Sequence, residues 1–334
     1  MEKHTFANLI RRLTKGGFKN DFIQAAILPD WWNEVAAQDP SLLPDIEIRV
    51  SRFLGIPLSS VQNPKIPLLP PIYPNAQLRR VKDINRDKLA PAIHSAIQIA
   101  GAVVRNLRRK EPSTPISFSD GLKWRDELKK DQSPVTLNEI LADIWNRGIP
   151  VVPLELIPAP SFQGLACIVE GNPVVLISHR QDELGRLAFW IAHEVGHIVA
   201  GDCSSGQPVI DESEDADDSD IEVKADLFAK QVLVGNNPIP LIDGEDFKQL
   251  ASRASKMEQT TGIEASQIIF AWASQSHDYA TATRAVQALY RGSGARRLLS
   301  QYFNNNIKFN EASESDSALL QCVYGVPRPN ATPN

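Results

Sequence analysis

The 334-residue sequence contains few cysteines and no long hydrophobic run. Its three cysteines, Cys167, Cys203 and Cys322, are odd in number and widely spaced, which excludes a disulfide framework and favours the reducing cytoplasm. The longest uncharged stretch, Leu89 to Val104, is too short and too polar to span a bilayer. The charged N-terminus lacks the apolar core of a signal peptide. We therefore expect a cytoplasmic protein that makes no contact with a membrane.

The sequence also lacks an excess of positive charge. Forty acidic and 35 basic residues give a formal charge of -5, so no domain-wide positive field favours nucleic acid as the main ligand. A composition that is 43% hydrophobic and 22% charged is ordinary for a folded protein and excludes disorder throughout. The length predicts two or three domains.

Changes in composition along the chain suggest where these domains begin and end. Residues 1–62 have the apolar periodicity of short helices, and the five prolines of residues 63–74 favour an extended, semi-rigid linker. Residues 75–242 then form the central domain, and residues 243–334 a helical region with a polar tail. We expect the tail after Asn304 to be mobile, with a short strand as the alternative near its end.

Local patterns predict both helices and strands in the central domain, so its class is α+β. Helices are expected over Asp87–Leu107 and Thr136–Asn146, and a hairpin of two strands over Leu165–Glu170 and Val174–Ser178. The acidic stretch from Asp202 to Asp220 is predicted to be a solvated loop, with a regulatory cation site as the alternative.

Chemistry is most strongly indicated in the apolar segment LGRLAFWIAHEVGHIVA, residues 184–200. His193 and His197 are four residues apart, so on a helix both imidazoles lie on one face and can reach one tetrahedral metal ion. Glu194 follows the first histidine and is placed to act as a general base. A chance match to His-Glu-x-x-His is expected on the order of once in a hundred chains of this histidine content.

A catalytic zinc site needs a third protein ligand and one open position. The metzincin arrangement is excluded, because Ala200 and Cys203 occupy the places of its glycine and third histidine. Glu222 and Asp226 instead share a face of a predicted helix beyond the acidic loop. Glu222 is the candidate third ligand, and Asp226 is the candidate acceptor for the free ring N–H of a ligating histidine. The alternative for this pair is two solvated acids on a surface helix.

These two motifs together resemble the ImmA/IrrE family of metallo-endopeptidases. HEVGH is followed by E-x-x-A-D-x-F-A-x-x-x-L from Glu222, and the resemblance covers roughly residues 138–240. Asp226 stands where the family usually has Asn, and Val234-Gly235 replaces the usual Met-Pro. The resemblance implies a zincin-like domain in which His193, His197 and Glu222 bind zinc, with manganese as the alternative, and Glu194 is the catalytic base.

The N-terminal unit carries a weaker resemblance. SRFLGIPLSSVQ, residues 51–62, is similar to the second half of an XRE-type helix-turn-helix. Seven basic and seven acidic side chains nevertheless balance within residues 1–62, which is unfavourable for binding phosphates. We interpret the unit as a protein-docking or degenerate DNA-binding module and favour docking. Trp31-Trp32 is either an anchor for a partner or part of the core.

Two functional hypotheses follow. The first is a cytoplasmic endopeptidase that cleaves a regulatory protein, such as a helix-turn-helix repressor or antitoxin-like partner, as the resemblance implies. The second is a DNA-binding regulator or toxin–antitoxin component whose zincin-like domain binds a partner without cleaving it. In zincins the substrate backbone typically pairs with a sheet edge, and Val174–Ser178 is the expected strand.

Overall fold

The computed structural model describes residues 4–71, 77–78, 86–109, 116–129, 133–159, 162–178, 182–203, 208–211, 220–236, 239, 246–290 and 294–324. The α-helices are α1 (Phe6–Lys15), α2 (Asn20–Phe22), α3 (Leu43–Leu54), α4 (Leu58–Gln62), α5 (Arg86–Arg105), α6 (Gly121–Leu128), α7 (Leu137–Asn146), α8 (Leu184–Ala200), α9 (Asp220–Leu233), α10 (Phe247–Thr261), α11 (Ala265–Ser276), α12 (Tyr279–Tyr290), α13 (Ala295–Asn306) and α14 (Glu314–Gln321). The strands are β1 (Gln77–Leu78), β2 (Val151–Pro153), β3 (Gly164–Val169), β4 (Asn172–Ile177) and β5 (Val209–Asp211). Short π and 3₁₀ segments are η1 (Ile23–Ile27), η2 (Ala36–Gln38), η3 (Pro40–Leu42), η4 (Phe309–Glu311) and η5 (Cys322–Tyr324).

The five strands form one mixed sheet in the order β1-β5-β3-β4-β2, so the fold is α+β as expected. β3 and β4 form the predicted hairpin, with Cys167 opposite Val174. The turn falls at Glu170 and Gly171, whose φ values of 51° and 78° match a tight two-residue hairpin turn. β2 runs parallel to β4, and β5 runs antiparallel to β3.

This strand order corrects one prediction. β4 lies between β3 and β2, and both neighbours hydrogen-bond to it. Because its backbone donors and acceptors are already paired, β4 cannot receive a substrate strand, and the prediction for Val174–Ser178 was wrong. The hairpin pattern was read correctly, but the sequence did not reveal that the short strand β2 returns to cover the far side of β4.

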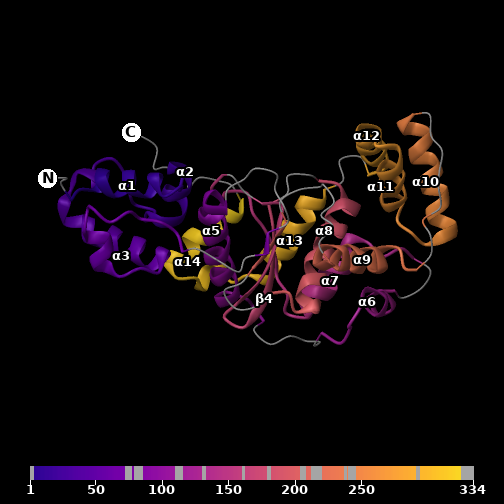
Figure 1. Ribbon diagram of the computed structural model, residues 1–334, viewed down its shortest axis with the longest axis horizontal. Coiled ribbons are helices and arrows are strands. Elements are labelled where there is room, and N and C mark those ends of the chain that lie inside the picture. Colours follow the sequence, from indigo (N-terminus) through magenta and orange to yellow (C-terminus); the bar gives the residue numbers. More distant parts are fainter. Residues whose placement is uncertain are drawn as a thin grey trace.

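Helices cover the sheet on both sides (Figure 1). α8 contacts β3 and β4, as does α5, and Figure 1 shows the sheet between α5 on one side and α7, α8 and α9 on the other. Thr136 caps the N-terminus of α7 and forms a capping box with Glu139, which explains why the helix starts directly after it. This layering places the segment that carries His193 and His197 directly over the hairpin.

The N-terminal unit is helical, and it packs against the described part of the proline-rich segment. Leu68 is fully buried, and the Arg12 guanidinium donates to the carbonyl of Ile66 at 3.0 Å. The C-terminal helix α14 contacts both η1 and α5. The prediction of a mobile tail is therefore wrong for residues 305–324, where helix α14, and not a strand, joins the N-terminal unit to the sheet domain.

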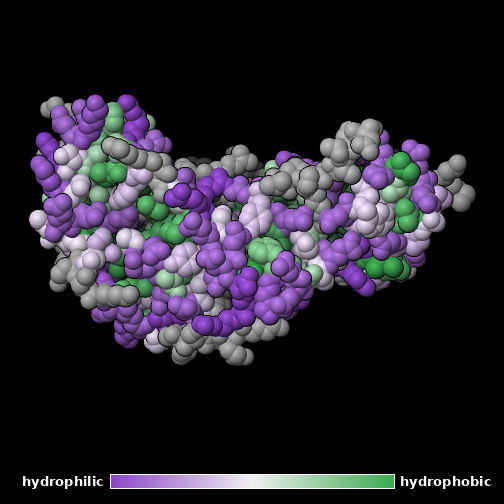
Figure 2. All heavy atoms as spheres, turned by 180° about the vertical axis from the view of Figure 1, so that it is seen from behind, coloured by the Kyte–Doolittle hydropathy of each residue, from purple (hydrophilic) through white to green (hydrophobic). Residues whose placement is uncertain are grey.

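Three helices, α10, α11 and α12, form a separate lobe at the other end of the molecule (Figure 1). α11 lies against α8, where Gln267 Nε2 donates to the Gly185 carbonyl at 2.7 Å. Figure 2 shows a largely hydrophilic face with apolar patches toward both ends of the molecule. Within the described part of the chain, none of the helices has both the length and the apolarity to cross a membrane.

Candidate metal centre

Helix α8 holds both histidines on its buried face. The helix ends at Gly201, which adopts the left-handed conformation with φ 77°, and the backbone N–H of Asp202 then donates to the His197 carbonyl at 3.0 Å. His193 and His197 are fully buried. Their ring centroids are 4.8 Å apart, as expected for side chains one helical turn apart.

Helix α9 supplies the third side chain because it packs unusually closely on α8. A Cβ placed on Gly196 would lie 3.3 Å from the Cα of Ala225 and 3.2 Å from the Cβ of Phe228. The glycine between the two histidines and the small Ala225 therefore set the helix separation. At this separation the Glu222 carboxylate reaches the two imidazoles from the facing helix.

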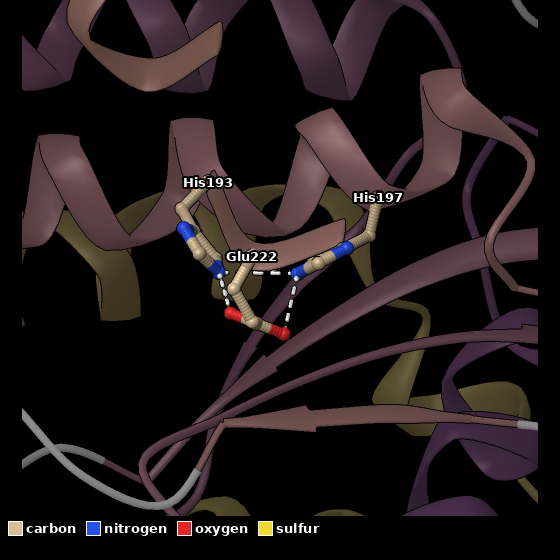
Figure 3. A group of neighbouring side chains, drawn as sticks. All are labelled: His193, His197 and Glu222. Carbon is tan, nitrogen blue, oxygen red and sulfur yellow. Dashed lines mark hydrogen bonds and ion pairs between the residues drawn. The ribbon is translucent and has the colours of Figure 1, made fainter. Parts of the chain in front are cut away.

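The three predicted ligands converge on one point (Figure 3). His193 Nε2 and His197 Nε2 are 3.1 Å apart, and they lie 3.2 Å and 3.5 Å from the Glu222 carboxylate oxygens. Among the residues that the structure describes, this is the one group of at least three His, Cys, Asp or Glu side chains whose ligand atoms lie within 4.8 Å of one another. Glu222, like both histidines, is buried.

The outward ring nitrogens are each paired with a carboxylate. His193 Nδ1 lies 2.9 Å from Asp226 Oδ1, and His197 Nδ1 lies 2.9 Å from Asp202 Oδ2. Since a carboxylate only accepts, each Nδ1 is the donor, and a neutral imidazole then has its lone pair on Nε2. Asp226 thus lies where the sequence placed it.

Asp202 is a site residue that the sequence reasoning missed. It was assigned to the acidic loop, yet it directly follows the helix-ending Gly201. A left-handed glycine at a helix end turns the next residue back toward the last helical turn. The signal was therefore an acid one residue after a glycine that closes the helix of His197.

The group could hold a metal ion. Zinc–nitrogen bonds of about 2.0–2.1 Å imply a separation of about 3.3 Å between two ligand atoms, and the two Nε2 atoms are 3.1 Å apart. Each Nε2 atom lies near a different oxygen of the Glu222 carboxylate, at 3.2 Å for His193 and 3.5 Å for His197. These residues suit zinc, with two imidazoles, one carboxylate and supporting carboxylates behind the imidazoles.

Glu194 follows His193 on α8, is fully buried, and has its carboxylate against strand β3. A Cβ on Gly164 would lie 2.1 Å from Glu194 Oε1, so the absence of a side chain at position 164 makes room for the carboxylate. The structure thereby identifies Gly164 as a second residue that the sequence reasoning missed. No motif marked it, because its requirement arises only from the packing of α8 on β3.

Two buried cysteines, Cys167 and Cys203, are not part of the group formed by His193, His197 and Glu222. Burial raises the pKa of Cys203 to about 12 and raises the pKa of Cys167 well above its usual range, with a further contribution from the charge of Glu194. Residues 212–219, which hold most of the acidic run with its alternative cation site, lie outside the described residues.

Comparison with known proteins finds no matching family model, no matching curated protein and no matching solved structure. The function must therefore be inferred from the chemistry of these side chains.

Proposed function

We propose that the protein is a zinc-dependent endopeptidase of the ImmA/IrrE type with a zincin-like catalytic domain. The observation that carries this proposal is Glu194, which follows His193 on α8 and whose buried carboxylate lies against Gly164 of β3. A metal site with only a structural role has no need of a carboxylate that is adjacent to the ligands but not among them.

The ligand set assigns a role to each side chain. His193, His197 and Glu222 would hold the ion, and Asp226 and Asp202 would fix the two rings with Nε2 toward it. Zinc bound by three protein ligands supplies Lewis-acid catalysis at its open position and makes a water molecule there more acidic. Glu194 takes the proton of the attacking water and later transfers it to the leaving amine.

A His-His-carboxylate set also occurs in non-haem iron oxygenases, and manganese is the alternative hydrolytic metal. Glu194 favours hydrolysis, because an oxygenase reaction does not require a general base at this position. The second functional hypothesis, a regulator that binds a partner without cleaving it, leaves the buried Glu194 without a role.

The proposed substrate is a regulatory protein, such as a helix-turn-helix repressor or an antitoxin-like partner, and the proposed compartment is the cytoplasm. The motif resemblance supports the substrate class. Three free, buried cysteines suit a reducing environment.

The test is to incubate the zinc-loaded full-length protein with helix-turn-helix repressors of the same organism and to analyse the products by mass spectrometry. We expect one or a few internal cuts that disappear with a chelator and return with added zinc. Stable binding without any cut would instead support the second hypothesis.

A further inference from the structure

A cavity of about 580 Å³ lies between α8, α9 and the C-terminal lobe. Phe189 and Trp190 of α8, Phe270 of α11 and Val234 beyond α9 form much of its wall. This volume is within the range of small-molecule and side-chain binding pockets, and the lining is mostly apolar.

The cavity continues the stripe of residues that carries the proposed ligands. Phe189 precedes His193 by one helical turn, and their ring centroids are 6.3 Å apart. On α9, Asp226 and Lys230 follow Glu222 at intervals of four residues, and both line the cavity. The faces of α8 and α9 that hold the metal ligands therefore run directly into this cavity.

Helix geometry gives the distance from the cleavage point. The cavity wall from Phe189 to Arg186 lies about 6 to 10 Å along α8 from His193, at about 1.5 Å per residue. An extended peptide advances about 3.3 to 3.6 Å per residue. A substrate side chain about two to three residues from the scissile bond would therefore reach the cavity.

The charges around the cavity favour an acidic neighbour for that side chain. Lys230 is exposed at the rim, and the Arg186 guanidinium lies 5.4 Å from the centre of the Phe270 ring. Among the described residues of the lining, the one carboxylate is that of Asp226, which is hydrogen-bonded to His193. The lining thus presents an apolar wall with a positively charged rim.

We propose that this cavity is the specificity subsite of the enzyme and that it binds a large apolar side chain next to an acidic residue of the substrate. The inference rests on the proposed function. Ala271 of α11, which is half-buried in the lining, would control the depth of the subsite.

The test uses the zinc-loaded full-length Glu194→Gln variant and two hexapeptides, one with phenylalanine before glutamate and one with alanine before glutamate, both otherwise alanine. We expect the phenylalanine peptide to bind about 10- to 100-fold more tightly, as burial of one aromatic side chain predicts. With Ala271→Trp added to this variant, the phenylalanine and alanine peptides should bind with equal affinity. The matched control, Ala288→Trp, places the same side chain on an exposed position of α12 and should leave the ratio intact.

Ser274→Phe provides a second way to fill the cavity from an exposed position, should Ala271→Trp fail to fold. Replacing glutamate by glutamine in the phenylalanine peptide should weaken binding by about two- to fivefold, and Lys230→Gln should abolish that difference. Equal binding of the phenylalanine and alanine peptides, or loss of the ratio with Ala288→Trp, would overturn the proposal.

The same peptides separate the subsite from the proposed function. If the wild-type protein cleaves neither peptide nor the repressor, yet the phenylalanine preference persists and depends on Ala271, the peptidase proposal fails and the subsite stands. If cleavage occurs without any preference for phenylalanine, the subsite proposal alone fails.

Discussion

Two regions of this molecule bury polar side chains in different arrangements. In the N-terminal unit the buried Arg12 donates to the carbonyls of Val61 and Ser60 at 2.7 Å and 3.1 Å. The buried Glu47 is paired with His4 and accepts from Gln62 at 3.0 Å. The donors of Arg12 and Gln62 thus meet acceptors, as is typical of buried polar groups in a stable fold.

At the α8–α9 site, three possible metal ligands converge. The two Nε2 atoms are 3.1 Å apart and lie 3.2 and 3.5 Å from the Glu222 carboxylate oxygens, while both Nδ1 atoms are paired with carboxylates that point away from the centre. Such a group could hold a metal ion. Burial of charged side chains is thus common to both regions, whereas the convergence of possible ligands distinguishes this site.

The largest effect should come from Glu194→Gln. The change removes the base but keeps the shape and the three ligands, so we expect zinc content to be unchanged and kcat for repressor cleavage to fall by at least about 10²- to 10⁴-fold. Glu47→Gln is the matched change of a buried carboxylate in the N-terminal unit. It should lower stability without altering zinc content or kcat. More than a few per cent residual activity in Glu194→Gln would remove the assigned role.

Replacing the proposed ligand Glu222 should weaken zinc binding more than replacing Asp226 or Asp202, which lie behind the histidines. Glu222→Ala removes a ligand, and its loss of zinc affinity, measured by competition with a chelator, should exceed that of Asp226→Ala or Asp202→Ala. We expect about 10- to 100-fold for each of those two positions, since they orient a ring without binding the ion. Normal zinc affinity in Glu222→Ala would require a different third ligand.

Gly164→Ala tests the space around the base. The added methyl group would contact Glu194 Oε1, so we expect kcat to fall about tenfold or more while zinc affinity changes little. Gly171→Ala, at a hairpin position with no neighbour within 4 Å, is the control for a glycine change in the same hairpin. It should alter stability and leave kcat alone. Equal kcat in both variants would contradict the role of Gly164.

The sequence was sufficient for the parts of this site that depend on local periodicity. The spacing of His193 and His197 on one helix, and of Glu222 and Asp226 on another, follows from 3.6 residues per turn. The β3–β4 hairpin was likewise predicted, although β4 begins at Asn172, two residues before the predicted Val174. Asp202, Gly164 and the neighbours of β4 were missed because each depends on how separate elements meet, and no short-range pattern records that.

The contact between the N-terminal unit and α5 should respond to acid through His94 of α5. Burial lowers the pKa of His94 to about 4, while its ring donates to the Phe53 carbonyl at 2.6 Å. Since the unfolded-state pKa is near 6.5, stability is full above pH 6.5 and is lost as the pH falls toward 4. We expect the zinc-free protein to lose roughly 2 kcal/mol between pH 7.5 and 5 from this group.

The contribution of His94 is obtained by subtracting the unfolding free energy of the His94→Gln variant from that of the wild type, because the other histidines are present in both proteins. Urea unfolding of wild type and variant at the two pH values should give a stability difference that shrinks by this amount at pH 5. A constant difference would mean that His94 does not couple protonation to folding.

The smallest expected effect concerns docking by the N-terminal unit. Trp32 packs against Phe6 with ring centroids 4.7 Å apart, whereas Trp31 is 49% exposed and Val35 79% exposed, so the tryptophan pair divides between core and surface. Deleting the whole unit would remove the contact between α14 and η1 and so disturb the fold. The double substitution Trp31→Ala with Val35→Asp changes only exposed side chains and keeps that contact. If the surface docks the substrate, this variant should lower kcat/KM for the folded repressor by about tenfold and leave cleavage of a short peptide unchanged.

The competing possibility is DNA binding, which requires basic side chains that can reach phosphates. Arg12 is committed to buried carbonyls, and Arg49 pairs with Asp45 at 3.1 Å and with Glu314 of α14 at 2.8 Å. Two of the seven basic residues of the unit are therefore held by the fold itself, which favours docking. Two results together would reverse this preference: a DNA gel shift that weakens steeply with salt, and unchanged repressor cleavage by the variant with Trp31→Ala and Val35→Asp. The second result matters because an apolar surface patch contributes little to a salt-dependent contact with DNA.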